Sequence, residues 1–208
     1  VQPGIVYISF PTESGTLYSK QELTELYAVC QTHNIPLFID GARLGYGLMA
    51  KNNDVTFEDI ANLCDVFYIG GTKVGALFGE CIVILNDLYK KDFRYSIKQH
   101  GGMLAKGRML GIQFEELFKD NRYLTISKHA IDMATILSEG FQSKGYHFYF
   151  PAETNQLFPI FKNTKLEELS KELAFTPWAK VDETHTAVRF VTSFMTKREN
   201  IEYLLTKI

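Results

Sequence analysis

The sequence predicts an α/β protein that begins with a parallel sheet and ends with a smaller α+β domain. Three short runs, at residues 5–10, 35–39 and 66–69, are rich in β-branched and aromatic residues, as buried strands are. Segments with apolar residues at helical spacing separate these runs. Such alternation is typical of a parallel sheet covered by helices on both faces. A further apolar run at 79–85 predicts a fourth strand.

Serine and threonine residues mark four expected helix starts. Ser19 precedes a helical pattern, and Glu22, three residues later, completes a capping box. Thr56, Thr164 and Thr196 stand before three further helical segments and are expected to cap them.

The pattern changes near residues 122–126. Residues 88–125 read as helical, with an interruption at Gly101-Gly102, and a helix near 126–140 follows. The strands expected after it are 147–150, 156–161, a segment near Trp178 and 187–194. The sequence therefore predicts a partial large domain at 1–123 and a small α+β domain at 124–208. Because strand material begins almost at residue 1, we expect the N-terminal part of the large domain to lie upstream of this chain.

Composition excludes several classes of protein. The chain has 208 residues, of which 46% are hydrophobic and 22% charged, and its net charge is −2. A substantial core is therefore expected, and nucleic acid is not expected as a partner. No apolar run has the length of a membrane span, and no signal peptide is evident. The cysteines Cys30, Cys64 and Cys81 lie too far apart for a short metal-binding pair, and we expect free thiols in the cytoplasm.

Asp40 stands at the end of the second expected strand. A carboxylate in this place is costly to bury unless a partner compensates its charge. A helix cap or a salt bridge to Arg43 would be the ordinary explanation. The functional alternative is that Asp40 faces a protonated ring nitrogen of a bound cofactor and keeps it protonated.

Lys73 follows the third expected strand in the glycine-flanked turn GGTKVGALFG. A solvated loop lysine is the ordinary explanation, and the segment lacks the spacing of a P-loop. The alternative is a lysine that forms an imine with a cofactor, since the small residues around it leave room for a flat ring. In a parallel sheet, both Asp40 and Lys73 would lie at the carboxyl edge, where such sheets bind ligands.

Together these motifs resemble the threonine aldolase and aromatic amino acid β-eliminating lyase family. The resemblance is carried by IDGARLGYGL, by IGGTKVGALFGE with its lysine 33 residues after the aspartate, and by HGGMLAKGRMLG and AVRFVTSF. It implies the aspartate aminotransferase-like fold, fold type I of the enzymes that use pyridoxal 5'-phosphate (PLP). The chain would then supply the C-terminal part of the large domain and a small α+β domain.

The resemblance also implies roles for individual residues. Lys73 would form the covalent imine with PLP, and Asp40 would pair with the pyridine nitrogen. Arg43 would support the 3'-oxygen of the cofactor or the substrate, and Thr72 would help to hold the phosphate. No metal is implied.

Arg189 would be the arginine that binds the substrate α-carboxylate. It lies in the apolar run AVRFVTSF, and a guanidinium forms a planar two-point clamp on carboxylates. The structural alternative is an arginine paired with Asp182 or Glu183.

One position departs from the family. Close aldolases carry an arginine directly after Gly-Gly-Met, used across the subunit interface, and here Leu104 stands there. Lys98, Lys106 and Arg108 are the possible substitutes, and His100 is the histidine nearest to this turn.

The resemblance implies cleavage of L-threonine or L-allo-threonine to glycine and acetaldehyde, in a cytoplasmic homodimer or homotetramer. β-Elimination from an aromatic or sulfur amino acid is the enzymatic alternative, with Lys73 as the base at Cα. A cofactor-free scaffold subunit is a third possibility, against which the presence of both Asp40 and Lys73 argues. The general base of the aldol cleavage is not assigned.

Overall fold

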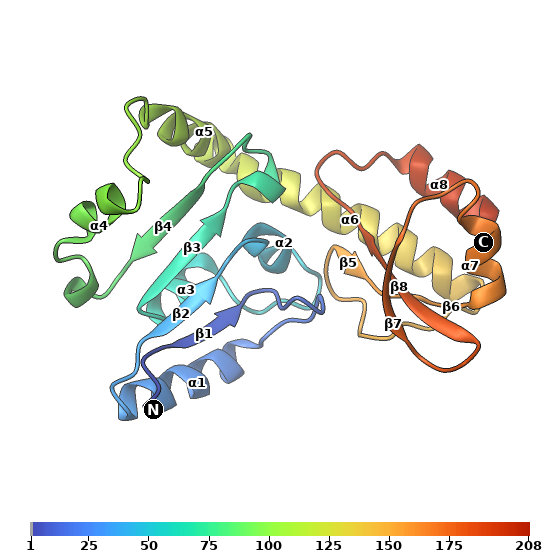
Figure 1. Cartoon of the computed structure of the whole chain (residues 1–208), viewed down its shortest axis with the longest axis horizontal. Coiled ribbons are helices and arrows are strands. Elements are labelled where there is room, and N and C mark those ends of the chain that lie inside the picture. The colour runs from blue at the N-terminus through green and yellow to red at the C-terminus, as the bar shows by residue number, and fades with distance from the viewer. Residues whose placement is uncertain (1) are drawn as a thin grey trace.

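The computed structural model describes residues 2–208 as two lobes joined by one long helix, α6 (Arg122–Ser143). The first lobe holds a four-stranded sheet, and the second holds another four-stranded sheet with its own helices (Figure 1). The division into domains at 1–123 and 124–208 stays a prediction.

The sheet of the first lobe has the order β1-β2-β3-β4. Its strands are β1 (Val6–Ser9), β2 (Leu37–Asp40), β3 (Val66–Gly70) and β4 (Glu80–Ile84). The first three are parallel, as expected, but β4 runs antiparallel to β3. The chain returns from β3 to β4 through residues 71–79 alone, which is too short for the crossover that a parallel neighbour requires.

Three helices cover one face of this sheet. They are α1 (Lys20–Thr32), α2 (Leu44–Leu48) and α3 (Phe57–Asn62). On the sheet side, the buried core that they share contains Leu37, Ile39, Phe67 and Ile69.

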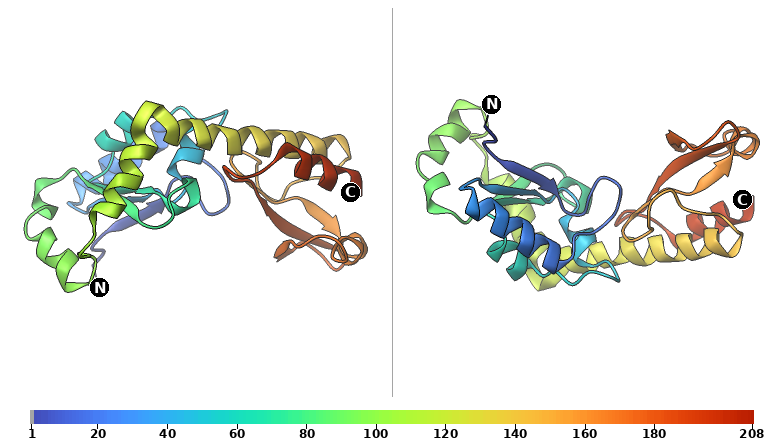
Figure 2. Two further views of the ribbon diagram at one scale, coloured as in Figure 1. Left: turned by 90° about the horizontal axis from the view of Figure 1, so that it is seen from above. Right: turned by 90° about the horizontal axis from the view of Figure 1, so that it is seen from below.

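The opposite face of the sheet remains open among the described residues. Tyr7 is 56% exposed and Ile82 is 50% exposed, and both alternate with the core residues of their strands. The side views show the helices on one side of the sheet (Figure 2). The expectation that helices cover both faces is therefore wrong for this chain, because residues 2–208 place no helix on that face.

Short helices connect β4 to α6. They are the 3-10 turn η2 (Asp87–Tyr89), α4 (Phe93–Gln99), α5 (Arg108–Phe118) and the 3-10 turn η3 (Lys119–Asn121). The expected interruption is confirmed: Gly101, with a φ of +76°, lies between α4 and α5. A positive φ is a conformation that glycine adopts readily, so the helix cannot continue through it without strain for another residue.

The two helix caps in the first lobe are confirmed. The Ser19 side chain accepts a hydrogen bond from the Glu22 amide, and the Glu22 carboxylate bonds back to Ser19. Thr56 and Asp59 form the same reciprocal box at α3. Each box satisfies two backbone N–H groups that the first turn leaves free.

The two expected caps in the second lobe are wrong. Helix α7 (Asn163–Leu169) already includes Thr164, so that residue lies inside the first turn. Helix α8 (Arg198–Lys207) starts after Lys197, and the Thr196 hydroxyl instead accepts a bond from the Ser193 amide at 2.8 Å. The threonine closes a preceding turn, a role that its sequence position alone does not distinguish from a cap.

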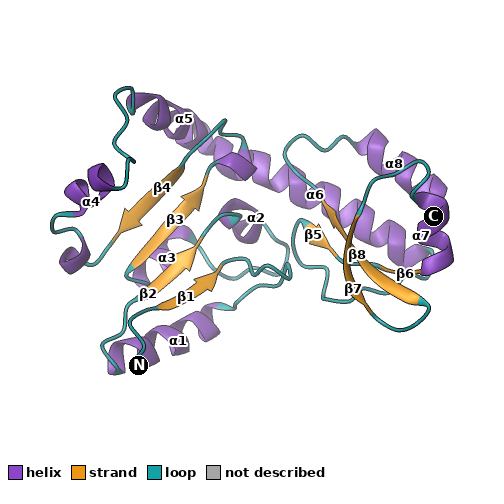
Figure 3. Ribbon diagram, viewed as in Figure 1, coloured by secondary structure: helices purple, strands orange, loops and turns teal. Residues whose placement is uncertain are grey.

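The second sheet is built around its longest strand, β8 (His185–Val191). Strands β5 (Gln156–Leu157), β6 (Ile160–Lys162) and β7 (Thr176–Lys180) all pair with β8 in antiparallel register. Helices α6, α7 and α8 pack beside this sheet (Figure 3). The expected strand near Trp178 is confirmed as β7. The strand expected at 187–194 is confirmed only as far as Val191, because β8 begins at His185 and ends there.

Two other strands expected in this lobe differ. Residues 147–150 contribute only one isolated bridge, between Phe148 and Pro159. The expected strand 156–161 is divided into β5 and β6, with Phe158 and Pro159 between them. Proline lacks the N–H group that a continuous ladder needs, so the sheet is interrupted there.

Helix α6 belongs to both lobes. Its residues up to Ile131 pack in the core of the first lobe, and those from Met133 onward pack in the second. The division expected at 123/124 falls in the first turn of this helix and stays a prediction. Among residues 2–208, no helix has the length and hydropathy to cross a membrane, and no group of three His, Cys, Asp or Glu side chains is placed to hold a metal.

Candidate active site

The carboxyl ends of β2 and β3 bring Asp40 and Lys73 to one edge of the sheet. These strands are parallel neighbours, so both end on the same side. Asp40 is the last residue of β2, and Lys73 lies in the 3-10 turn Thr72–Val74 directly after β3. The expected placement of the acid and the amine is therefore present, and these strand ends point toward the second lobe (Figure 1).

Two glycines let the strand ends approach closely. The Gly70 amide donates to the Gly41 carbonyl at 2.8 Å. A Cβ atom at Gly41 would lie 2.0 Å from the Tyr68 carbonyl oxygen, and one at Gly70 would lie 2.2 Å from the Ala42 oxygen. Any other residue at these positions would push the strand ends apart, and with them Asp40 and Lys73.

The carboxylate of Asp40 is held by hydrogen bonds. The Ala42 amide donates to Oδ1 at 2.9 Å, and the Tyr7 hydroxyl donates to Oδ2. Burial pushes the pKa of Asp40 upward, but hydrogen bonds from Tyr68, Tyr7 and Ala42 and the positive charge of Lys73 outweigh it, so the pKa lies below its ordinary value. Asp40 is therefore a fixed anion at neutral pH, and Lys73 is near enough to contribute to this.

Neither ordinary explanation for Asp40 describes the structure. The residue that precedes α2 is Arg43, and no side chain caps that helix. Arg43 forms its ion pair with Glu13, at 3.3 Å between Nη1 and Oε1, rather than with Asp40.

A cavity of about 330 Å³ lies between the lobes and collects four of the five expected site residues. The first lobe contributes Arg43, Tyr46, Thr72 and Lys73, and the second contributes Asn155, Arg189, Val191, Thr192, Ser193 and Phe194. Asp40 is the expected site residue that does not line it. Its link to the cavity is electrostatic, through Lys73.

Thr72 is already engaged by Glu80, the first residue of β4. Its hydroxyl donates to Glu80 Oε1 at 3.1 Å, and the Gly71 amide donates to Glu80 Oε2 at 2.6 Å. Glu80 therefore fixes the turn that carries Lys73, and the Thr72 hydroxyl has to leave Glu80 before it can donate to an anion.

Arg189 enters the cavity with an unpaired donor. Its Nε atom is buried and has no hydrogen-bond partner among the described residues. The guanidinium carbon lies 5.8 Å from the centroid of the Trp178 ring, a cation–π contact that does not use the N–H groups. Buried donors are normally satisfied, so the guanidinium of Arg189 keeps hydrogen-bonding capacity that residues 2–208 do not use.

The structural alternative for Arg189 is wrong. The Asp182 carboxylate bonds to Thr184 and His185, and Glu183 pairs with Lys180 at 2.7 Å. Both acids are used locally in the β7–β8 turn, because that turn places its own cation and N–H groups closer to them.

Two residues at the cavity were not expected there. From the sequence, Tyr46 is expected to be a core aromatic residue, and it is 1% exposed. Its hydroxyl nevertheless donates to the Lys73 carbonyl and forms a hydrogen bond with the backbone of Phe194. Burial raises the pKa of Tyr46 to about 12, so it remains protonated at neutral pH. Asn155 donates to the Thr192 carbonyl at 2.8 Å, and its own Oδ1 is buried without a partner within residues 2–208. Tyr46 lies within the motif DGARLGYG, which weakly indicates a place near the site, whereas no sequence pattern indicates such a place for Asn155.

The residues around the departure from the family pattern lie away from this cavity. Lys98, Leu104, Lys106 and Arg108 are exposed on or near α4 and α5. His100 is the C-cap residue directly after α4, and its Nδ1 forms a hydrogen bond with the Ser96 carbonyl at 2.8 Å.

Comparison with known proteins assigns the family. The sequence pattern of the β-eliminating lyases matches residues 2–164, which include Asp40, Arg43, Thr72 and Lys73. This chain belongs to the β-eliminating lyase family. A curated relative from a Pseudomonas species, a low specificity L-threonine aldolase, is 33% identical over 172 residues, which are 81% of this chain and 49% of the relative.

Solved structures agree with this family and confirm the expected fold. The threonine aldolase of Leishmania major is 43% identical, with a TM-score of 0.96 over 99% of this chain and 60% of its own. A Thermus thermophilus aspartate aminotransferase, at 14% identity, shares the fold with a TM-score of 0.70 over 100% of this chain and 57% of its own. This β-eliminating lyase chain spans about half the length of the curated relatives it matches.

Proposed function

We propose that the protein is a PLP-dependent aldolase that cleaves L-threonine or L-allo-threonine to glycine and acetaldehyde. The observation that carries this proposal is the cavity that joins the amine of Lys73 to the unpaired guanidinium of Arg189. An amine for a cofactor aldehyde and a cation for a substrate carboxylate are the two groups that this chemistry requires on opposite sides of one site. The similarity to aldolases from Leishmania and Pseudomonas supports it.

The residues present fit PLP. Asp40 is a half-buried anion without a salt bridge among the described residues, as a partner for a pyridinium should be, and the positive charge of Lys73 acts on it. Arg43 and Thr72 would lie next to the ring and the phosphate. When bound, PLP supplies an electron-withdrawing ring that stabilises negative charge at the substrate Cα.

The side chains of this chain would orient the reaction. Arg189 would clamp the α-carboxylate and so determine which bond at Cα stands perpendicular to the ring. Asp40 would hold a proton on the ring nitrogen, because its own pKa is lowered. Tyr46 is excluded as the base for the β-hydroxyl proton, because its raised pKa keeps it protonated.

Product analysis on the full-length protein tests this proposal. With PLP and L-threonine, we expect equal amounts of glycine and acetaldehyde. A keto acid and ammonia would instead indicate β-elimination, in which Lys73 would take the Cα proton. Borohydride reduction followed by peptide mapping should place the cofactor on Lys73, and a colourless, unlabelled protein would favour the scaffold alternative.

We infer that a second copy of the chain covers the surface formed by the segment after Lys73 together with α4 and α5. Apolar side chains are exposed along it, with Leu77 at 87%, Tyr95 at 75%, Leu104 at 52% and Ile112 at 51%. Large apolar side chains with this degree of exposure are more common at protein interfaces than elsewhere on a surface. The surface adjoins the lysine turn, since the Leu77 amide donates to Gln113 of α5 at 2.7 Å. A homodimer or homotetramer would use it, in a cytoplasm where Cys30, Cys64 and Cys81 stay reduced.

A further inference from the structure

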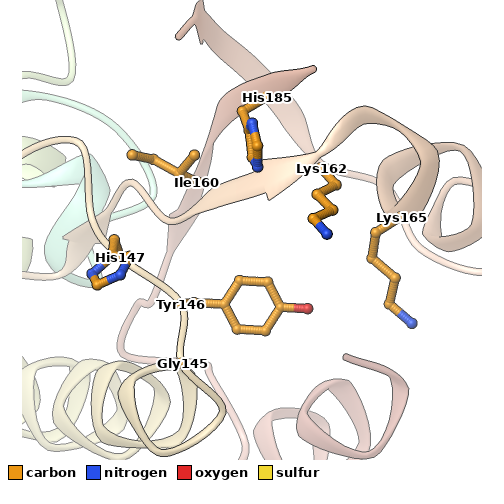
Figure 4. A pocket seen from close by; sticks show the side chains of 7 residues that line it. All are labelled: Gly145, Tyr146, His147, Ile160, Lys162, Lys165 and His185. Atoms are coloured by element: carbon orange, nitrogen blue, oxygen red, sulfur yellow. The ribbon is translucent and has the colours of Figure 1, made fainter. Parts of the chain in front are cut away.

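A second cavity, of about 440 Å³, lies in the second lobe and shares no residue with the active-site cavity. It is formed where the turn after α6 meets β6, β8 and α7 (Figure 4). Its lining consists of Gly145, Tyr146, His147, Ile160, Lys162, Lys165 and His185. Its volume is in the range of small-molecule sites.

The lining concentrates basic side chains from separate elements. Lys162 of β6 stands directly opposite His185 of β8 in the antiparallel register, so both side chains project from the same face. Lys165 follows on α7, and His147 comes from the turn after α6. Basic groups placed directly opposite on neighbouring strands repel each other when both are charged, and a bound anion would relieve this repulsion.

Acids approach two of these basic groups. Lys165 meets Glu168 at 3.4 Å, and His185 contacts Asp182 at 3.2 Å. Lys162 has no salt bridge among residues 2–208. Neither carboxylate lines the cavity, so the groups that face it are basic and Lys162 is available to an anion there.

An apolar surface stands beside these cations. The Tyr146 ring packs on Phe161, with 4.5 Å between centroids, and is thereby fixed in place. In the close view the ring crosses the cavity with its hydroxyl directed toward the side of Lys162 and Lys165, while Ile160 lies on the other side (Figure 4). A ligand with an anionic end and a flat apolar body would match both surfaces.

We propose that this cavity binds a small phosphate monoester with an apolar body, at a site separate from the active site. A phosphate monoester carries more than one negative charge at neutral pH and has three strong acceptor oxygens, so it can contact cations from separate elements at once. A carboxylate has one charge and two acceptor oxygens, so it would satisfy fewer of the basic groups that line this cavity. The phosphate would lie among Lys162, Lys165 and His185, and the organic group would lie on Tyr146.

Calorimetric titration of the full-length protein with phenyl phosphate tests this proposal. We expect saturable binding that becomes roughly tenfold weaker or more in Lys162→Gln with Lys165→Gln. Lys171→Gln is the matched control, because Lys171 is an exposed lysine just after α7 that does not line the cavity, and this variant should bind as the unchanged protein does. Lys162→Arg keeps the charge and should retain most of the affinity.

Phenyl phosphate could also bind at another anion site, such as one beside Lys73. That binding would be the same in all these variants, so it does not affect the difference in affinity between them. The test therefore stands apart from the proposed aldolase activity. Equal affinity in the double variant and the control would overturn the proposal, as would the absence of saturable binding. Benzoate binding as tightly as phenyl phosphate would also overturn it, because the site would then select a carboxylate.

Discussion

At the scale of single residues, Arg189 and Asp40 show opposite solutions to burying a charge. Arg189 keeps a buried N–H without a partner among the described residues, and under the proposed function a substrate carboxylate would pair with this guanidinium. Asp40 is surrounded by donors from Tyr7, Tyr68 and Ala42, so its charge is stabilised before any ligand binds. The first arrangement suits a substrate that enters and leaves, and the second suits a group that stays ionised throughout.

Replacing Arg189 should impair substrate binding more than cofactor binding. For Arg189→Lys we expect kcat/KM for L-threonine to fall about 100-fold, mostly through KM, because the two-point clamp is lost. The PLP absorbance of the variant should be unchanged. Arg198→Ala is the control, since Arg198 pairs with Glu202 on the exposed surface of α8. Loss of cofactor absorbance in Arg189→Lys would contradict the assigned role.

Removing the Tyr7 hydroxyl should raise the pKa of Asp40. The Tyr7 hydroxyl donates a hydrogen bond to the Asp40 carboxylate, which lowers the pKa of Asp40, whereas burial raises it. Without this hydroxyl, fewer hydrogen bonds oppose the effect of burial. In Tyr7→Phe, carboxyl NMR should report a higher pKa for Asp40, and Tyr149→Phe, at an exposed tyrosine, should leave it unchanged. An identical pKa in Tyr7→Phe would show that this contact does not tune the acid.

The sign of the stability effect follows from the same pKa. Folding lowers the pKa of Asp40, so its ionised form stabilises the folded protein when the pH is above the ordinary pKa of an aspartate. This contribution is lost as the pH falls through the lowered pKa of the folded state. Tyr7→Phe should reduce this stabilisation at neutral pH, so its free energy of unfolding should depend less steeply on pH in the acid range.

At the scale of elements, two strand ends and two glycines determine the position of the site. Parallel pairing of β2 and β3 directs Asp40 and the lysine turn to one edge, and the contact of Gly41 with Gly70 sets how close they come. Tyr46 of α2 then ties the Lys73 backbone toward Phe194 of the second lobe. The lysine is therefore held by its own turn and by the neighbouring lobe.

A methyl group at Gly70 should therefore be costly. In Gly70→Ala the new Cβ would lie 2.2 Å from a backbone oxygen that cannot rotate away. We expect the free energy of unfolding, measured in urea, to fall by about 2 kcal/mol or more, the upper part of the range for overpacked sites. Gly111→Ala in α5 is the control: no atom lies within 4 Å of its Cβ, so a gain of about 0.5–1 kcal/mol is expected from helix propensity. A Gly70→Ala variant as stable as the unchanged protein would contradict the tight approach.

At the scale of the whole molecule, the surface of α4, α5 and the segment after Lys73 exposes apolar side chains that no other part of the described chain covers. We expect Leu104→Glu with Ile112→Glu to shift the full-length protein toward monomer in sedimentation velocity, because charges would be buried without partners at the interface. Tyr203→Glu, on the exposed side of α8, should leave the oligomer intact. A double variant that sediments as the unchanged protein does would place the interface elsewhere.

Local patterns were sufficient for the elements that depend on near neighbours. The strands up to 85, the capping boxes at Ser19 and Thr56 and the break at Gly101 follow from residue spacing and backbone freedom, which act within a few residues. The family motifs likewise placed Lys73 and Arg189, since each motif is short and contiguous. Asp40 at a strand end could be expected on the same basis.

Three-dimensional packing was needed wherever distant segments compete for the same partner. The antiparallel β4, the open face at Tyr7, and the unpaired Arg189 depend on what lies across space, as does the buried Asn155. The cavity between the lobes joins Lys73 to Arg189, which lie 116 positions apart in the chain, and α6 connects the two lobes that carry them. Sequence pattern reports which groups a chain carries, but only the fold determines which of them are left without a neighbour, and in this protein those groups mark the proposed sites.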